Sequence, residues 1–174
     1  MYSGVSFLHN SSAPNTQSFK RARWVDALCL LAAPSSVLLD QLTKHWATEA
    51  YGQSSEVGNS YLGGWLSLVY TTNSGAAFGI LEGRNALFLL IGIVVCSALA
   101  VYWRLLGKAR PVARIGLGLL LGGACGNAID RARNGHVVDF LQIRFWPVFN
   151  LADLCIVVGV MLLLYAVLDM RASG

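Results

Sequence analysis

Long apolar runs, separated by shorter polar connections, dominate the pattern along the chain. The clearest run, Ala86 to Trp103, contains no charged residue. A run from about Val112 to Ile129 is weaker because Arg114 and several glycines interrupt it. The last run, from about Asn150 to Asp169, has Asp153 as its only internal charge. Each run has close to the roughly 20 residues that an α-helix needs to cross a bilayer.

A further apolar run follows three basic residues near the start of the chain, Lys20, Arg21 and Arg23. A basic segment before an apolar one is also typical of a cleaved signal peptide. Ala32-Ala33-Pro34 is a poor cleavage site, however, and the helical pattern continues beyond it. We therefore predict a retained first helix over about Trp24 to Trp46.

These runs predict a membrane α-helical fold with four transmembrane helices in a single domain, residues 24–171. Residues 1–23 precede the domain, and up to Phe19 they are rich in Ser, Asn, Thr and Gln and contain no charged residue. Such a segment buries too little apolar surface to fold by itself. We expect it to be a flexible cytoplasmic tail.

Basic residues lie on one side of the predicted spans. They precede the first helix, separate the second from the third and follow the fourth: Lys20, Arg21, Arg23, Arg104, Lys108, Arg110, Arg114 and Arg171. Because loops rich in Lys and Arg stay in the cytoplasm, both termini are predicted to be cytoplasmic. The connections at about residues 47–85 and 130–149 then face outward.

The first outward connection contains a predicted strand. Residues Trp65 to Thr71 are mostly β-branched, aromatic or aliphatic and partly alternate with polar residues, and glycine or asparagine lies at both ends. Open sheet edges cannot lie in lipid. We therefore predict a small extracytoplasmic β-sheet between helices 1 and 2, lying on the membrane surface.

Composition agrees with a membrane protein. Of the 174 residues, 55% are hydrophobic and 13% charged, against about 25% charged in soluble domains. The net charge of +4 comes from the basic residues between the apolar runs, so no nucleic-acid partner is expected. The four cysteines and three histidines are scattered and form no metal-binding motif. We expect no metal and no cofactor.

Ionisable side chains at the ends of spans cost free energy, so each is a candidate functional residue. Asp40 and Lys44 have the i,i+4 spacing of a helical ion pair, which leaves a structural role and a site role open. Asp130 continues a row of glycines at four-residue intervals that favours close helix packing. Asn127 and Arg131 beside it can hydrogen-bond or neutralise it, either in a structural network or in a site.

Asp139 and Asp153 lie in or beside the second outward connection. Asn150 and Asp153 have the spacing of a helix cap, which accounts for one acid but not for both. Two close carboxyl groups share a proton, and such a pair can perform acid and base catalysis in peptide hydrolysis. Spacing alone leaves an aspartyl hydrolase, a transporter and a scaffold open.

Five motifs, in order along the chain, resemble those of the bacterial lipoprotein signal peptidases, the signal peptidase II family. They are Asp40-x-x-Thr43-Lys44, Asn73-x-Gly75-Ala76-Ala77-Phe78, Gly122-Gly123-x-x-Gly126-Asn127-x-x-Asp130-Arg131, Gly135-x-Val137-x-Asp139-Phe140 and Phe149-Asn150-x-Ala152-Asp153. The resemblance implies a four-helix aspartyl endopeptidase of the bacterial inner membrane, acting toward the outer face. Its substrates would be prolipoproteins, cut before a cysteine that carries diacylglycerol.

The resemblance also implies roles for individual residues. Asp139 and Asp153 would be the catalytic dyad. The other motif residues would support them or bind substrate: Asp40, Lys44, Asn73, Gly75, Asn127, Asp130, Arg131 and Asn150. The Ala76-Ala77-Phe78 run would offer small and apolar surface to a lipidated chain. The implied partners are lipidated prolipoproteins and membrane lipid, and the enzyme is expected to be a monomer.

Overall fold

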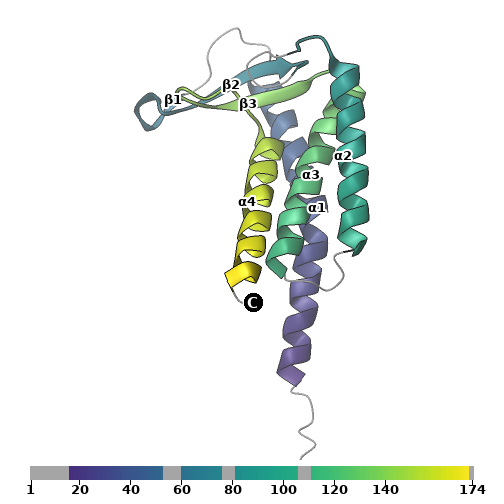
Figure 1. Cartoon of the computed structure of the whole chain (residues 1–174). Coiled ribbons are helices and arrows are strands. Elements are labelled where there is room, and N and C mark those ends of the chain that lie inside the picture. The colour runs from purple at the N-terminus through teal and green to yellow at the C-terminus, as the bar shows by residue number, and fades with distance from the viewer. Residues whose placement is uncertain (1–15, 53–59, 76–80, 106–110, 173–174) are drawn as a thin grey trace, which may run out of the picture.

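The computed structural model describes residues 16–52, 60–75, 81–105 and 111–172. Within these ranges, four α-helices lie side by side, with a small sheet across one end (Figure 1). The helices are α1 (Thr16–Tyr51), α2 (Asn85–Leu105), α3 (Pro111–Asn134) and α4 (Leu151–Ala172). The first fifteen residues of the expected tail and the Ala76–Phe78 run lie outside the described residues.

Helix α1 is longer than predicted at both ends. It begins at Thr16 instead of Trp24 and ends at Tyr51 instead of Trp46, with Pro34 inside it. Its first turns project beyond the other helices (Figure 1). The added segments contain few large apolar residues, so apolar periodicity could not reveal them. Extending a formed helix is far cheaper than nucleating one, which lets such residues continue it.

The other three helices lie close to their predicted ranges. Among the described residues, three helices are long and apolar enough to cross a membrane: α2, α3 and α4. Helix α2 buries none of its apolar span against the rest of the protein. A helix that is apolar on its exposed faces needs lipid around it, as expected for a membrane protein.

Helix α3 packs against each of the other three helices. Two of its glycines show why the contacts are close. A Cβ atom on Gly126 would lie 2.5 Å from Asp40 Oδ2 of α1, and one on Gly116 would lie 2.9 Å from the Gly159 carbonyl oxygen of α4. The absence of a side chain at these positions therefore lets α1 and α4 approach α3 closely, and Gly126 belongs to the glycine row for which this role was predicted.

The sheet corrects the predicted position of the strands. Its antiparallel order is β1 (Ser60–Tyr61), β2 (Leu66–Asn73) and β3 (Val137–Ile143), with a short 3-10 turn, η1 (Leu62–Gly64), after β1. Strands β1 and β2 come from the predicted connection between the first two helices, but β3 comes from the connection between α3 and α4. The sheet is therefore not confined to the segment between helices 1 and 2.

Strand β3 lacked a clear signal in the sequence. Val137, Val138, Asp139 and Phe140 are all buried, so the strand does not alternate between apolar and polar residues. Its partner β2 holds it in register, with Thr71 opposite Asp139 and an irregularity between Leu68 and Thr71. This pairing places Asp139 beneath the sheet, next to the helix ends.

The α3–α4 contact predicts the effect of a larger residue at Gly159. Its Cβ would lie 2.6 Å from the Gly116 carbonyl oxygen and 2.8 Å from the Leu120 amide nitrogen, and backbone atoms cannot move aside cheaply. Overpacking costs about 1–3 kcal/mol, and each kcal/mol lowers the melting temperature by about 2–4 °C at this chain length. We expect Gly159→Val to melt several degrees below the wild type in detergent.

Gly92 of α2 provides the control for this measurement. A Cβ there would meet the Ala128 Cβ of α3 at 3.3 Å, a single side-chain contact that a small shift of the peripheral helix α2 can relieve. Gly92→Ala is therefore expected to change the melting temperature much less. Equal losses in both variants would show that the close α3–α4 approach has no special role in stability.

Candidate active site

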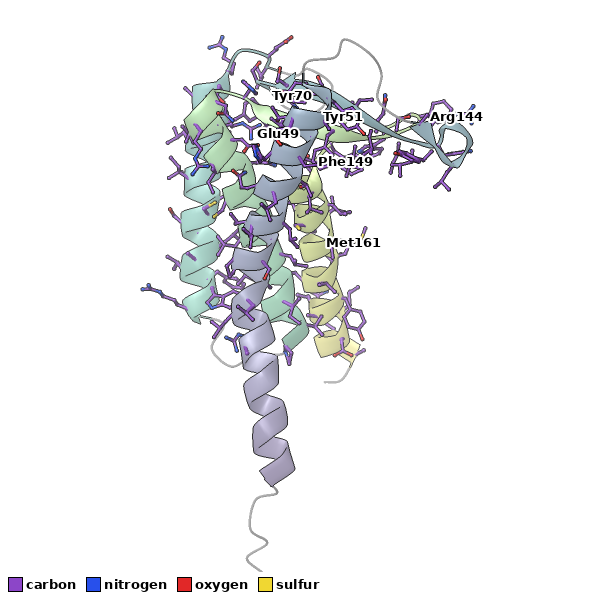
Figure 2. All side chains as sticks on the ribbon, turned by 180° about the vertical axis from the view of Figure 1, so that it is seen from behind. Glu49, Tyr51, Tyr70, Arg144, Phe149 and Met161 are labelled. Atoms are coloured by element: carbon purple, nitrogen blue, oxygen red, sulfur yellow. The ribbon has the colours of Figure 1, made fainter. Side chains whose placement is uncertain are left out.

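The polar residues of five elements converge where the helices meet the sheet. They come from α1, the end of β2, α3, β3 and the first turn of α4 with the residue before it: Asp40, Gln41, Lys44, Asn73, Asn127, Asp130, Arg131, Asp139, Asn150 and Asp153. Gly75, two residues after the end of β2, joins them through its backbone. A cavity of about 360 Å³ opens beside them. Phe149, which lines the cavity, lies at the sheet end of α4, whereas Met161 lies farther along that helix (Figure 2).

Six of the predicted site residues line this cavity: Asn73, Gly75, Asn127, Arg131, Asp139 and Asp153. The other four lie behind its wall: Asp40, Lys44, Asp130 and Asn150 are each no more than 4% exposed. The structure thus brings all ten together but separates them into a cavity-facing group and a supporting group. Among the described residues, no three His, Cys, Asp or Glu side chains are grouped to hold a metal ion.

Asp139 is held by two amide side chains. Its Oδ1 accepts a hydrogen bond of 2.7 Å from Asn150 Nδ2, and its Oδ2 accepts one of 3.2 Å from Asn73 Nδ2. Asn73 in turn accepts a 2.9 Å bond from the Gly75 backbone N–H at its Oδ1. Because this bond occupies the amide oxygen, the Asn73 nitrogen is left to face Asp139.

Asp153 lies in the first turn of α4, where it forms a reciprocal cap with Asn150. The Asp153 backbone N–H donates to Asn150 Oδ1 at 3.0 Å, and the Asn150 backbone N–H donates to Asp153 Oδ2 at 3.2 Å. This agrees with the capping predicted from their spacing. The second carboxylate oxygen, Oδ1, accepts a 2.8 Å bond from Asn127 Nδ2, so capping and site geometry coexist in one residue.

Asn127 connects both acids to a buried cation. Its side-chain oxygen accepts hydrogen bonds from Lys44 Nζ at 3.0 Å and from Asn150 Nδ2 at 3.2 Å. Since an ammonium group can only donate, it fixes which end of the Asn127 amide faces Asp153. Lys44 therefore orients the donor to Asp153, while Asn150 joins the same network to Asp139.

Lys44 is itself held between two carboxylates. Its Nζ lies 2.8 Å from Asp40 Oδ2 and 2.8 Å from Asp130 Oδ2. The Asp40–Lys44 pair has the helical geometry predicted from its spacing. Asp40 Oδ1 also accepts a 2.9 Å bond from the Ala152 backbone N–H, and Asp130 accepts one of 2.8 Å from Gln41 Nε2. These contacts join α1, α3 and α4 behind the cavity.

Arg131 and Asp130 interact through their charges but do not form a direct ion pair, because successive helical side chains point in different directions. The Arg131 guanidinium instead donates to the Gly75 carbonyl oxygen at 3.1 Å and lies 5.3 Å from the centre of the Phe88 ring. Asp130 is paired with Lys44, and Arg131 contributes a cation to the cavity wall.

The surroundings of Asp139 favour its protonated form. Burial raises the pKa of this carboxyl group, the negative charge of Asp153 raises it further, and the result is a pKa of about 6. Hydrogen bonds from Asn73 and Asn150 and the charge of Lys44 oppose part of this rise. Two carboxyl groups on one cavity, of which one binds a proton well above its ordinary range, can supply an acid and a base together.

Gln41 and several apolar lining residues were not predicted. Gln41 bridges Asp40 and Asp130 through its side-chain nitrogen, and its position directly after Asp40 in a helix was the available signal. The apolar lining comes from four separate segments: Phe88, Val137, Trp146, Pro147, Val148, Phe149 and Val157. Such residues are common throughout this chain, so sequence alone could not single out those that face the cavity.

Comparisons with known proteins agree with these motifs. The family model described as signal peptidase (SPase) II matches residues 32–169. The lipoprotein signal peptidase of Moorella thermoacetica is 41% identical over 139 residues, covering 80% of this chain and 91% of the relative. That of Halothermothrix orenii is 45% identical over 130 residues, covering 74% and 86%.

Solved structures of two bacterial membrane enzymes have the same fold. One gives a TM-score of 0.71 at 31% identity, covering 84% of this chain and 90% of the solved one. The other gives 0.65 at 32% identity, covering 80% and 92%. The family model and the relatives together show that this chain belongs to the signal peptidase II family.

Proposed function

We propose that Asp139 and Asp153 are the catalytic dyad with which this signal peptidase cuts diacylglyceryl-modified prolipoproteins before the lipidated cysteine. The chain is a membrane aspartyl endopeptidase of the signal peptidase II family and removes signal peptides from prolipoproteins. The observation that carries the dyad assignment is that both carboxyl groups line one cavity, where the charge of Asp153 helps to raise the pKa of Asp139.

The two acids have different roles. Asp153 lies in the first turn of α4 and accepts a hydrogen bond from Asn127 at its Oδ1, and its side chain lines the cavity. As the base, it takes a proton from the attacking water. Asp139, whose pKa is raised to about 6, donates a hydrogen bond from its protonated carboxyl group to the scissile carbonyl oxygen. The tetrahedral intermediate then collapses: its C–N bond breaks, and the proton that Asp153 took from the water passes to the leaving amine.

The supporting residues set the geometry of this pair. Lys44 fixes the Asn127 amide, and Asn127 holds Asp153. Asn73 and Asn150 hold Asp139. Asp40 and Asp130 neutralise Lys44 and tie it to its neighbours. Arg131, on the cavity wall, and the loop of Asn73 and Gly75 beside it are suited to binding backbone carbonyl oxygens of the substrate peptide.

The cavity suits a substrate that remains in the membrane. Phe88 of α2 and Val157 of α4 line it, and both helices expose apolar side chains along their length. The acyl chains of the substrate can stay in lipid while the peptide bond enters the cavity. A single chain contains every residue assigned to the site, which supports a monomeric enzyme.

The proposed topology has four membrane helices, with α1 as the first. Both termini lie in the cytoplasm, and the dyad and the sheet face the outer side of the bacterial inner membrane. Arg104 and Arg171 lie at the ends of α2 and α4 that are distant from the site, as positive-inside topology requires. The acids of the site gather at one end of the bundle, unlike a proton path distributed through the membrane.

Dyad substitutions test the function directly. Purified wild-type protein in detergent should release the signal peptide from a lipidated precursor and leave the unlipidated precursor largely intact. Asp139→Asn and Asp153→Asn should each lower the rate by about 10²- to 10⁴-fold, the usual contribution of acid–base catalysis. The double variant should be scarcely worse, because the two residues act as a unit. Signal-peptide release is followed by gel mobility.

Asp130→Asn is the matched control for this experiment. It changes an equally buried acid that pairs with Lys44, so folded yield and melting temperature should fall more than the turnover of the folded fraction. The assignment is wrong if folded Asp139→Asn protein cleaves the precursor while folded, substrate-binding Asp130→Asn protein does not. The dyad would then be Asp130 with Asp153.

The raised pKa of Asp139 predicts a pH-dependent stability. The carboxyl group titrates near pH 6 in the folded protein and at about 3.9 when unfolded, so the folded state binds the extra proton between these values. The wild type should therefore lose stability relative to Asp139→Asn as the pH rises from about 4 to about 6. Thermal unfolding of both proteins across this range measures it.

Infrared titration follows the same proton directly. The protonated-carboxyl band present in the wild type and absent from Asp139→Asn should disappear with a midpoint near pH 6. Asp153→Asn removes a neighbouring negative charge, so it should lower that midpoint. A midpoint near 4 that does not respond to Asp153→Asn would contradict the coupling between the two acids.

Cysteine labelling in whole cells tests the topology. Glu82 and Arg171 are both exposed, and the proposed topology places them on opposite sides of the membrane. A membrane-impermeant maleimide should label Glu82→Cys in intact cells and Arg171→Cys after lysis alone, with the parent protein as the background control. The reverse pattern would place the dyad on the cytoplasmic side and refute the orientation.

A further inference from the structure

A second cavity lies at the opposite end of the bundle from the dyad. It has a volume of about 280 Å³ and is lined by residues of α1, α2 and α3: Leu30, Ala33, Ala100, Trp103, Arg104 and Leu121. Helices α1 and α2 each pack on α3 but make little contact with each other over their described residues, so α3 forms the floor of a groove between them. We call this the α1–α2 groove.

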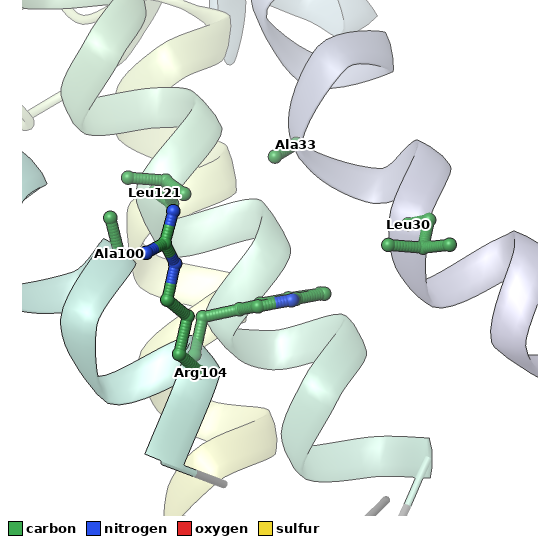
Figure 3. A pocket seen from close by; sticks show the side chains of 6 residues that line it. Leu30, Ala33, Ala100, Arg104 and Leu121 are labelled. Atoms are coloured by element: carbon green, nitrogen blue, oxygen red, sulfur yellow. The ribbon is translucent and has the colours of Figure 1, made fainter. Parts of the chain in front are cut away.

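One cation points into this otherwise apolar groove. Figure 3 shows the Arg104 side chain extending toward Ala100 and Leu121, with Leu30 and Ala33 on the facing helix. Within the described ranges, no acidic side chain forms a salt bridge with Arg104. A guanidinium group in this position favours an anion that offers several oxygen atoms.

The wall beside Arg104 is held in place by a second arginine. The Arg114 guanidinium of α3 lies 5.3 Å from the centre of the Trp103 ring, a cation–π contact across the end of the groove. Tryptophan is enriched at the depth where lipid headgroups meet acyl chains. The groove therefore has a polar end suited to a headgroup and an apolar length suited to an acyl chain.

We infer that the α1–α2 groove binds one anionic phospholipid, with its phosphate on Arg104 and an acyl chain along Leu30, Ala33 and Leu121. The volume is near the lower end of the roughly 300–1,000 Å³ of enclosed ligand pockets, which suits one chain better than a whole enclosed molecule. Under the proposed topology the lipid belongs to the cytoplasmic leaflet, whose anionic lipids attract basic residues. The inference does not depend on the catalytic assignment.

The positive charge of Arg104 favours a phospholipid over the signal peptide of the substrate as the occupant of the groove. A signal peptide carries a basic segment before its apolar segment, and that basic segment lies on the cytoplasmic side. Arg104 would repel it but attracts a phosphate. Zwitterionic lipids carry their own cation beside the phosphate, so a lipid with a net negative charge should bind more tightly.

Native mass spectrometry of the full-length protein tests the inference. Detergent-purified protein is mixed with equal amounts of phosphatidylglycerol and phosphatidylcholine that have identical acyl chains. We expect one retained lipid, with phosphatidylglycerol favoured about fivefold, the factor expected for one basic residue at a membrane surface. Arg104→Gln should reduce this preference to near parity.

Two further variants distinguish the groove from a general charge effect. Arg171→Gln removes the same charge from the exposed end of α4, away from the groove, and should keep the preference. Ala100→Phe should fill the groove and reduce retention of both lipids while Arg104 remains. Melting temperature and precursor cleavage, which should stay at wild-type levels in all three variants, confirm that each is folded.

The inference is overturned by any of three results. The wild type could retain both lipids equally, Arg104→Gln could keep the preference in folded protein, or Arg171→Gln could lose as much of it as Arg104→Gln. A signal peptide that displaces phosphatidylglycerol from the wild type and from Asp139→Asn, but not from Ala100→Phe, would assign the groove to the substrate instead.

Discussion

The buried ammonium group of Lys44 is the interaction on which the active-site end of the protein depends. Its three N–H donors have three acceptors, on Asp40, Asp130 and Asn127. The carboxylates then accept bonds from the backbone N–H groups of Ala152 in α4 and Val138 in β3. One cation thereby holds four elements together. Removing one partner of such a buried pair costs about 3–5 kcal/mol, because the remaining charge is left without compensation.

The same arrangement leaves the proposed dyad, Asp139 and Asp153, without a salt-bridged cation of its own among the described residues. Lys44 is occupied by two carboxylates, and Arg131 donates to backbone oxygens instead of to an acid. Asp139 and Asp153 are supported by amides, which stabilise a carboxylate less than a full positive charge does. Burial and mutual repulsion can therefore raise the pKa of Asp139 to about 6. A dedicated ion pair would hold both acids ionised and leave no acid for catalysis.

The spacing of residues along the chain predicted the local contacts of this site. It could not predict the contacts between residues that are far apart in the sequence. The Asp40–Lys44 pair and the Asn150–Asp153 cap each lie within one or two helical turns, where spacing fixes geometry. The Lys44–Asp130 contact joins two helices, and no local pattern encodes it. Adjacency along the chain suggested Arg131 instead, although neighbouring helical residues point apart. Strand β3 was missed for a related reason, since its buried acid breaks the alternation on which strand prediction relies.

Gly126 resolves the choice between a packing role and a site role for the glycine row of α3. A side chain there would collide with the Asp40 carboxylate, which lies 2.8 Å from Lys44. The gap left by this glycine admits the carboxylate that holds Lys44, and Lys44 in turn orients Asn127, one residue further along α3. Close helix packing and placement of the proposed catalytic acids therefore depend on the same missing Cβ atom. Within this bundle, the structural and the functional interpretations describe one arrangement.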